Sequence, residues 1–424
     1  MQKSAVHALV DRKEQQSILL QNLIKSLSSN PFYREKFSAA GIEPGDIKST
    51  ADLHRLPFTV KDDLRHNYPL GLQAAPDRDI VRVHSSSGTT GQPIIVPYTQ
   101  KDVDIWSEMM ARCMKMVGVH KGDRVQITPG YGLWTAGIGF QAGAELLGAM
   151  AVPIGPGNTD KQLQLMSDLQ TTVLIGTSSY GLLLAEEADR RGVINQLSLR
   201  LGIFGSERWG EKMRSRIEAI LGIDTFDIYG LTEVYGPGIA IDCPYHTGLH
   251  YWDDHLIFEI IDPHTGKQVA PGEKGELVIT TLTKEGMPLL RFRTRDLTRI
   301  IPDPCPCGSP YPMIDRIVGR TDDMIKVKGV QVYPAEIENV LRSTPGVSSE
   351  YQIIVDRKEG KDTALLRVER DRGSRMSAAE TSDMCRRQIK SSIGITMDIE
   401  IVDFMGLPRS EKKTKRVIDN RQTN

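Results

Sequence analysis

The middle of the chain alternates short apolar runs with helical stretches, and this alternation restricts the possible folds more than any other feature. Helix-like segments such as 160–169 and 210–221 separate the apolar runs. Strands joined by helical crossovers pair in parallel, because a tight turn cannot connect parallel neighbours. The pattern therefore predicts an α/β fold with a doubly wound, mostly parallel sheet, whose expected strands are 125–128, 151–154, 172–176, 202–205 and 225–229.

The segments on either side of this series predict further parts of the fold. Residues 99–117 have helical spacing, with Thr99 placed to cap the helix, and we interpret their Met and Cys stripe as core. Residues 252–300 have the pattern of a β-rich subdomain. From Gly319 the order strand, helix, strand, strand, helix, strand indicates a separate α+β unit. We therefore expect an N-terminal domain at 1–318, a hinge at 319–323 and a C-terminal domain at 324–424.

Charge and cysteine content limit the partner and the compartment. The 424 residues carry a formal net charge of −1. This balance argues against a nucleic acid or an anionic membrane as partner, so we expect a small molecule. The uncharged run 125–144 is interrupted by glycine and proline, so no membrane span is expected. Five cysteines without an export signal indicate reduced thiols or metal ligands in a cytoplasmic protein.

A run of hydroxyl residues and glycines between two strand-like segments predicts a phosphate cradle. Glycines let backbone N–H groups turn toward an anion, and hydroxyl groups add donors. The run is not a Walker loop, because Gln92 stands where that motif has its lysine. The alternative is an ordinary flexible turn. The residues of this loop are Ser85, Ser86, Ser87, Gly88, Thr89, Thr90 and Gly91.

Five further motifs follow this loop in order along the chain. They are Gly-Ser-Glu-Arg-Trp at 205–209, Tyr-Gly-Leu-Thr-Glu at 229–233, Arg-Thr-Arg-Asp at 293–296, Gly-Arg-Thr-Asp-Asp at 319–323, and Leu-Pro-Arg-Ser-Glu-Lys-Lys at 407–413. Together the six motifs resemble those of the adenylate-forming superfamily, and within it the phenylacetate-coenzyme A ligase family. The resemblance covers roughly the whole chain. It implies that ATP converts a carboxylic acid to an acyl-AMP, and that coenzyme A then displaces AMP.

The resemblance also implies roles for the phosphate-binding residues. Ser85–Thr90 would hold the β- and γ-phosphates, Thr232 would meet the α-phosphate, and Glu233 would anchor Mg²⁺. Glu233 as a plain helix N-terminal acid is the alternative. Asp296 would accept hydrogen bonds from both ribose hydroxyls, unless it merely pairs with Arg293 or Arg295. Further nucleotide contacts are expected from Ser206, Glu207, Arg208, Tyr229, Gly230 and Arg320.

The last motif and the hinge carry the expected catalytic lysine and the expected pivot. Lys413 matches the final lysine of the family pattern Arg-Ser-Glu-Gly-Lys, although Lys412 replaces the glycine, so Lys412 and Lys415 are competing candidates. Such a lysine would bridge the carboxylate and the α-phosphate and then leave as a mobile C-terminal domain rotates. Asp322 would be the pivot, or else a turn residue. Gly329 would let the backbone pass close to the pantetheine channel.

A second group of residues has the composition of a structural zinc site. Cys243, His250, Cys305 and Cys307 offer three thiolates and one imidazole, which would complete a tetrahedral Zn²⁺ shell. His246 competes with His250 for the fourth position. Free thiols with a surface histidine are the alternative interpretation.

The acyl pocket is expected on the loop and helix start near residue 131. Small residues beside aromatic ones suit a flat ring, and plain sheet-to-helix packing is the alternative. We therefore predict an ATP-dependent ligase that adenylates a phenylacetate-like acid and transfers it to coenzyme A, with a homodimer as a possible assembly. Transfer of AMP to a deazaflavin, loading of a carrier protein, and a binding module without activity are the rival functions. The expected pocket residues are Tyr131, Trp134, Ala136, Gly137 and Phe140.

Overall fold

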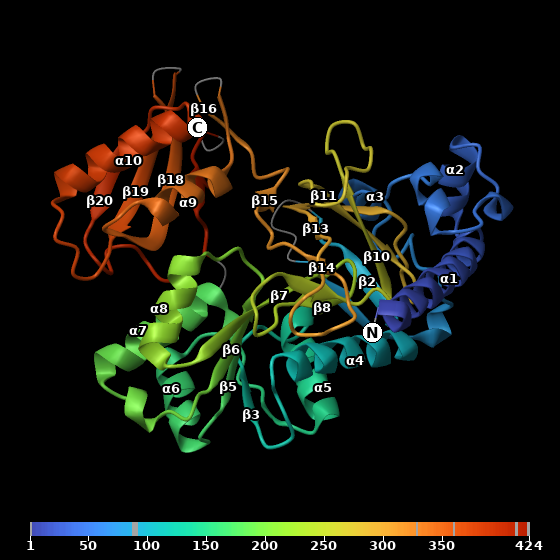
Figure 1. Ribbon diagram of the computed structural model, residues 1–424, viewed down its shortest axis with the longest axis horizontal. Coiled ribbons are helices and arrows are strands. Elements are labelled where there is room, and N and C mark those ends of the chain that lie inside the picture. The colour runs from blue at the N-terminus through green and yellow to red at the C-terminus, as the bar shows by residue number, and fades with distance from the viewer. Residues whose placement is uncertain (1, 87–91, 328–329, 359–360, 412–413, 422–424) are drawn as a thin grey trace.

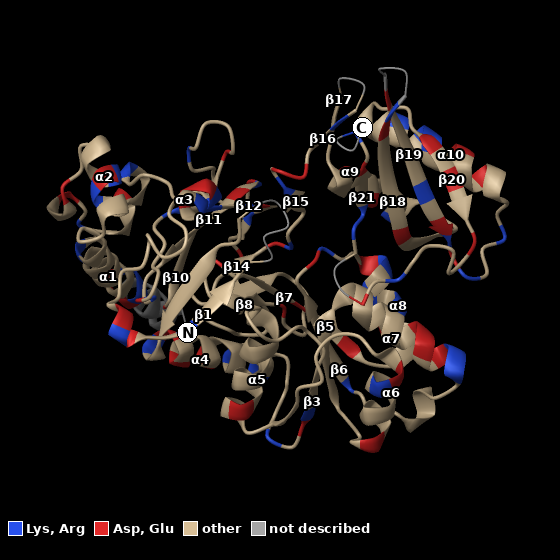
Figure 2. Ribbon diagram, turned by 180° about the vertical axis from the view of Figure 1, so that it is seen from behind, with Lys and Arg blue, Asp and Glu red and all other residues tan. Residues whose placement is uncertain are grey.

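The computed structural model describes residues 2–86, 92–327, 330–358, 361–411 and 414–421. A large N-terminal body carries a smaller C-terminal domain at one end (Figure 1). Charged residues of both signs are interspersed over both parts in the view of Figure 2. Among the described helices, none combines the length and the apolar character that a membrane crossing requires.

A nine-stranded sheet forms the centre of the N-terminal body, in the order β13-β14-β9-β8-β7-β6-β5-β3-β4. Its parallel strands confirm the predicted series: β3 (Arg124–Ile127), β4 (Met150–Val152), β5 (Val173–Thr177), β6 (Leu201–Gly205) and β7 (Asp224–Leu231). The antiparallel strands are β8 (Gly236–Ile241), β9 (Leu249–Tyr251), β13 (Ile300–Ile301) and β14 (Met313–Ile314). The associated helices are α4 (Gln100–Met116), α5 (Thr135–Leu147), α6 (Thr159–Asp168), α7 (Ser178–Arg191) and α8 (Glu211–Leu221).

Two details of α4 agree with the sequence pattern. The Thr99 hydroxyl accepts a hydrogen bond from the Asp102 amide, and Asp102 in turn accepts one from the Thr99 amide, so the helix begins with a reciprocal cap. The Met and Cys stripe is buried. The α5 helix packs closely on this face because Gly139 has no side chain. A Cβ atom there would lie 2.3 Å from the Trp106 ring.

The N-terminal body has three further helices, α1 (Gln2–Leu27), α2 (Pro31–Ala39) and α3 (Lys61–His66), with 3₁₀ turns at Pro44–Asp46, Thr50–Arg55 and Asp77–Asp79. Another 3₁₀ turn, Ile194–Gln196, lies between α7 and β6. β1 (Ile80–Ser85) and β2 (Ile95–Thr99) form an antiparallel pair. The predicted β-rich part is an antiparallel sheet of β10 (Leu256–Ile261), β11 (Gly275–Thr281), β12 (Phe292–Thr298) and β15 (Gly319–Arg320).

The C-terminal domain has a sheet and a core of its own. Its sheet order is β20-β19-β18-β21. Buried side chains such as Ile337, Leu366 and Cys385 form an apolar cluster confined to this domain. None of the apolar clusters built from described residues combines both sides of Gly319. The elements are β16 (Ile325–Val327), β17 (Val330–Val332), α9 (Pro334–Ser343), β18 (Val347–Lys358), β19 (Lys361–Arg370), α10 (Ala378–Ile393), β20 (Asp398–Val402) and β21 (Val417–Asp419).

Candidate active site

The predicted phosphate loop begins at the end of β1 and returns at β2, and its two ends are fastened together. The Ser86 amide donates to the Ile94 carbonyl at 3.0 Å, and the Ile94 amide donates to the Ser86 hydroxyl at 3.0 Å. The Ser85 amide donates to the carbonyl of Leu133, which belongs to the predicted acyl loop. Hydrogen bonds between Ser86 and Ile94 therefore close the neck of the loop. The predicted residues Ser87, Gly88, Thr89, Thr90 and Gly91 lie outside the described part of the chain.

Glu233 lies in the turn after β7, directly following Thr232, and its side chain is only 7% exposed. Its carboxylate Oε1 lies 3.0 Å from the Nζ of Lys61 at the start of α3. This ammonium compensates the charge of a carboxylate that would otherwise be buried alone. Sequence reasoning missed Lys61, because no local signal in a short polar helix indicates a partner more than 170 residues away.

Asp296 is held by two donors that the sequence motifs had placed near the nucleotide. The Tyr229 hydroxyl donates to Oδ2 at 2.6 Å, and Arg320 Nη1 donates to Oδ1 at 2.8 Å. Burial raises the pKa of the Asp296 carboxyl, and Arg320 and Tyr229 oppose that shift. The pairing with Arg293 or Arg295 that was considered as an alternative does not occur, because both guanidinium groups face Glu276 instead, as their ion pairs show. The predicted ribose contact remains a prediction.

The loop after β6 connects to the segment that follows the predicted catalytic lysine. Glu207 Oε1 accepts from the Ser179 amide at 2.7 Å, and its Oε2 accepts from the Thr414 amide at 2.9 Å. Ser206 in the same loop has a left-handed φ of 68°, which is unusual for a residue with a side chain. Residue 414 therefore lies against the expected nucleotide side of the sheet. Lys413 and Lys412 are outside the described residues, as is Gly329.

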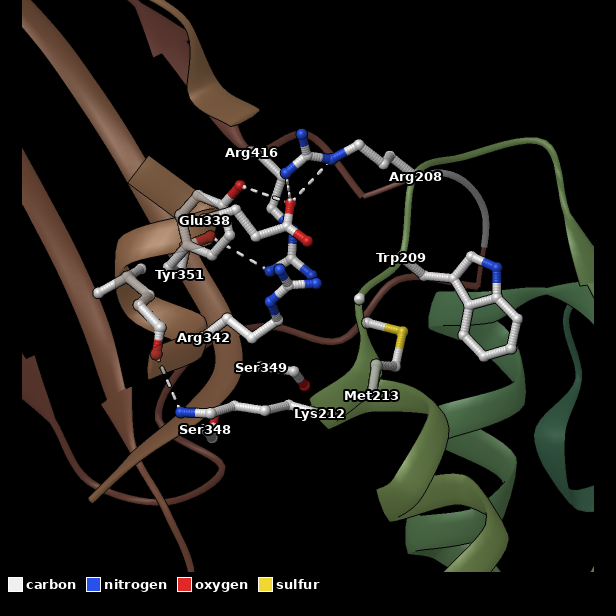
Figure 3. Close-up of a pocket in the computed structure, with 12 residues that line it drawn as sticks. Arg208, Trp209, Lys212, Met213, Glu338, Arg342, Ser348, Ser349, Tyr351 and Arg416 are labelled. Carbon is white, nitrogen blue, oxygen red and sulfur yellow. Dashed lines mark hydrogen bonds and ion pairs between the residues drawn. The ribbon is translucent and has the colours of Figure 1, made fainter. Parts of the chain in front are cut away.

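Arg208 joins the two domains in this conformation. Its guanidinium forms an ion pair with Glu338 of α9 and donates to the Val318 carbonyl at 2.6 Å. Figure 3 shows this group at the edge of a cavity between α8 and the C-terminal domain. The residues lining this cavity do not include Ser85, Glu233 or Asp296. The cavity is thus a feature of the domain interface and is separate from the expected phosphate site.

The predicted acyl loop divides into an inner and an outer part. The Tyr131 ring lies against Gly137, where a Cβ atom would come within 2.7 Å of the ring, and the Tyr131 hydroxyl is buried without a hydrogen-bond partner among the described residues. Phe140 is buried in the main core and Ala136 packs against that core. Trp134 is 52% exposed. The structure therefore brings Tyr131 and Gly137 together and leaves Trp134 at the surface.

The structure brings Cys243, His250, Cys305 and Cys307 together. Their ligand atoms all lie within 4.8 Å of one another. The His250 Nδ1 donates to the Tyr311 carbonyl at 2.8 Å and leaves Nε2 facing the Cys307 sulfur at 3.3 Å. A ring nitrogen fixed in this way by a backbone carbonyl is the usual arrangement behind a metal-ligating histidine. The donor set fits tetrahedral Zn²⁺.

His246 does not belong to this cluster. Its Nδ1 lies 2.6 Å from an Asp242 carboxylate oxygen, and its ring stacks on Phe226.

Burial alone would raise the pKa of the Cys305 thiol, but hydrogen bonds from Thr247 and from the Cys307 amide lower it to about 6. Burial raises the pKa of the Cys243 and Cys307 thiols, so Cys305 is the one thiol of this cluster whose surroundings favour a thiolate without a bound cation.

Comparisons with known proteins agree with this geometry. The family described as "AMP-binding enzyme" matches residues 3–283, and the "AMP-binding enzyme C-terminal domain" matches residues 329–421, so the chain is an AMP-binding enzyme by sequence and fold. It is 44% identical to the phenylacetate-coenzyme A ligase of Escherichia coli (strain K12) over 92% of this chain and 90% of the relative. It is 42% identical to the Pseudomonas putida enzyme of the same name over 99% and 96%. The chain belongs to the phenylacetate-coenzyme A ligase family.

Solved structures of a related ligase add information on the domain arrangement. In the postadenylation state with its acyl-AMP bound, 2-hydroxyisobutyryl-CoA ligase matches with a TM-score of 0.88 at 29% identity, covering 98% of this chain and 90% of that chain. In the thioesterification state with coenzyme A, the score falls to 0.71 at the same identity, with coverages of 97% and 90%. Both structures are of the same ligase at the same identity, so the lower TM-score reflects a different domain arrangement and not a different sequence. The arrangement of the two domains in this structure is therefore more similar to that of the postadenylation structure of this ligase than to that of its thioesterification structure.

Proposed function

We propose that the protein is an AMP-forming ligase that activates phenylacetate, or a close aryl-acetate, and transfers it to coenzyme A. In the first half-reaction a carboxylate oxygen attacks the α-phosphorus of ATP, and the bond to the β-phosphate breaks to release pyrophosphate. In the second, the sulfur of coenzyme A attacks the acyl carbon and AMP leaves, while the thiol proton passes to solvent. The observation that carries the proposal is identity above 40% to phenylacetate-coenzyme A ligases over nearly the whole chain.

The Tyr229–Asp296–Arg320 group supports the assignment of the nucleotide side. Each carboxylate oxygen can accept more than one hydrogen bond, so Asp296 can receive the ribose hydroxyls while Tyr229 and Arg320 keep it oriented. The Glu207–Thr414 contact supports a place for Lys413 beside the same loop. There the lysine would stabilise charge on the carboxylate and the α-phosphate.

Two metal ions belong to this proposal. Mg²⁺ would be held by Glu233 with the phosphates, and when bound it neutralises phosphate charge. Lys61 pairs with the same Glu233 carboxylate and would help to orient it. Zn²⁺ would be held by the three cysteines and His250, with no position left for a substrate, so it would be a structural ion that fastens the antiparallel end of the large sheet.

The acyl group would lie against the Tyr131 ring, which itself packs on Gly137. An aryl ring stacked on this flat side chain gains contact area that a long chain would not use. Free coenzyme A as the acceptor, rather than a carrier protein or a deazaflavin, rests on the names of the relatives. A homodimer remains an expectation.

A panel of carboxylic acids assayed for coenzyme A-dependent AMP formation tests the proposal. We expect the highest kcat/KM for phenylacetate, with 2-hydroxyisobutyrate and saturated C8 acids well below it. In the Ala136→Trp variant the KM for phenylacetate should rise more than that for smaller acids, because overpacking excludes the ring first. A higher kcat/KM for any fatty acid than for every aryl acid would refute the substrate. AMP formation that does not require coenzyme A would refute the acceptor.

A further inference from the structure

Lys284 is a buried lysine whose ammonium is enclosed by aromatic rings. It lies between β11 and β12 and is 3% exposed. Its Nζ is 3.7 Å from the centre of the Tyr98 ring and 4.4 Å from that of Tyr235. The same Nζ donates a hydrogen bond to the Val234 carbonyl at 2.5 Å. No ion pair among the described residues involves it.

An ammonium at this position is costly unless its environment compensates for the water it loses. Two ring faces and one carbonyl provide that compensation, as in cation–π sites. Burial nevertheless lowers the pKa of Lys284 to about 7, and the carboxylate of Asp102 partly opposes the shift. An aliphatic residue would fill the same space without this penalty, so the amino group and its hydrogen bond to the Val234 carbonyl are the features that require an explanation.

The Tyr98 and Tyr235 rings around Lys284 connect the two segments that are expected to contact the phosphates. Tyr98 lies in β2, the strand that follows the phosphate loop, and the His84 ring, directly before that loop, packs edge-on against it at 5.2 Å. Val234 and Tyr235 directly follow Glu233 on the other side. The Lys284 amino group therefore contacts both the strand that follows the phosphate loop and the residues that follow Glu233.

The turn that carries Lys284 is itself fixed in the N-terminal body. The amides of Glu285 and Gly286 each donate to the Asp102 carboxylate at 2.8 Å, and Asp102 belongs to the capped first turn of α4. The ammonium is thus attached to a rigid support and is not carried by a free loop.

We propose that Lys284 is a positioning residue for adenylation, which holds the Thr232–Glu233 turn at a fixed place relative to the phosphate loop that begins at Ser85. It acts through the Val234 carbonyl and the two tyrosine rings and does not itself contact the acid, ATP or coenzyme A. The inference rests on the proposed function, because that function gives the turn its role in binding Mg·ATP.

The test compares Lys284→Met, which keeps the length and removes the charge and the donor, with Lys284→Arg and with Lys101→Met. Lys101 is a matched control, because it is an exposed lysine paired with Glu285, one residue from Lys284. Mg·ATP affinity is measured by calorimetry, and pyrophosphate exchange and thioester formation from supplied acyl-AMP are measured separately. We expect Lys284→Met to weaken Mg·ATP binding and slow exchange about tenfold, with thioester formation within about twofold of wild type. Lys284→Arg should be intermediate and Lys101→Met unchanged.

Two results would overturn the inference. One is a folded Lys284→Met protein with wild-type Mg·ATP affinity, and the other is an equal loss in both half-reactions. If this variant does not fold, Tyr98→Leu, which removes one ring face and keeps the lysine, decides the question by the same measurements. Failure of the wild-type protein to bind Mg·ATP would instead refute the proposed function, so the two failures are distinguishable.

Discussion

The N-terminal part of the candidate site and its contacts with the C-terminal domain are held by different forces. Asp296, Tyr229 and the neck of the phosphate loop are fixed by short hydrogen bonds beside apolar clusters of the N-terminal body. Across the domain interface, long charged side chains make the contacts. Lys212 of α8 donates to three carbonyls of the C-terminal domain, each at 2.9 Å, at Leu341, Thr344 and Val347.

A group of buried charges would allow the domain interface to separate without leaving a carboxylate unpaired. Arg409 pairs with Glu369 of its own domain and with Glu186 of α7, and Glu186 also pairs with Arg216. If the C-terminal domain rotates, Glu369 travels with Arg409, and Glu186 keeps Arg216 as its partner. Neither carboxylate is then left buried without a cation, which is the costly outcome. The difference between the two regions is that the contacts of the first lie within one body, whereas those of the second would have to be remade if the C-terminal domain rotates as the family resemblance predicts.

The sharpest test of this comparison is Lys413→Ala. Adenylation should fall by about a hundredfold or more, since the proposed role of this lysine is to stabilise transition-state charge, while thioester formation from supplied acyl-AMP should be largely retained. Pyrophosphate release and thioester formation are assayed separately, with Lys412→Ala as the control. If Lys412→Ala loses adenylation and Lys413→Ala does not, the register of the motif is wrong by one residue.

Asp322→Pro tests the expected rotation of the C-terminal domain between the two half-reactions. Proline fixes φ, so a pivot at this position should be held near one arrangement. The Gly319–Arg320 strand β15 pairs with β12, which ties the start of the expected hinge to the N-terminal body. We expect one half-reaction to fall by at least about tenfold more than the other. An equal loss in both, with an unchanged melting temperature, would show that Asp322 is not the pivot.

Glu186→Gln removes one charge from the interface and leaves Arg409 with Glu369. Adenylation should fall about threefold, because the arrangement seen here is weakened, and thioester formation should be unchanged or faster. Glu187→Gln is the matched control, because Glu187 pairs only with Arg190 and Arg191 among the ion pairs of described residues. Equal effects of the two substitutions would contradict a specific role for the interface contact.

The smallest effect on chemistry is expected at the Cys/His cluster. Cys307→Ser or chelation should lower the melting temperature and release about one zinc per chain, with kcat nearly unchanged, because four protein ligands leave no open position. Elemental analysis and thermal unfolding check this expectation. Untreated protein with less than about half an equivalent of zinc and with thiols that react freely would contradict it.

The sequence predicted the parts of the fold that local patterns control. The five parallel strands, the Thr99 cap and the buried Cys113 stripe follow from periodicity and capping chemistry within a few residues. The family motifs also pointed to Tyr229, Asp296 and Arg320, which the structure brings together.

The contacts that the sequence did not predict depend on side-chain direction and on distant partners. His246 lies in the turn between β8 and β9 with a left-handed φ of 51° and pairs with Asp242, whereas His250 lies in β9 and faces Cys307. Spacing along the sequence does not fix these directions. Lys61 and Glu233 come from elements that meet only in the folded protein. The turn of Arg208 toward Glu338 depends on a domain arrangement, which is a property of one conformation.

The charged domain interface should make the balance between the two expected domain arrangements depend on ionic strength. The Arg372–Asp189 pair is exposed on both sides and is screened at physiological ionic strength, whereas the Arg409–Glu186 pair is buried and is screened much less. The apolar contacts within each domain core carry no charge for salt to screen. Raising the salt concentration should therefore shift the populations of the two domain arrangements more than it changes the packing within either domain.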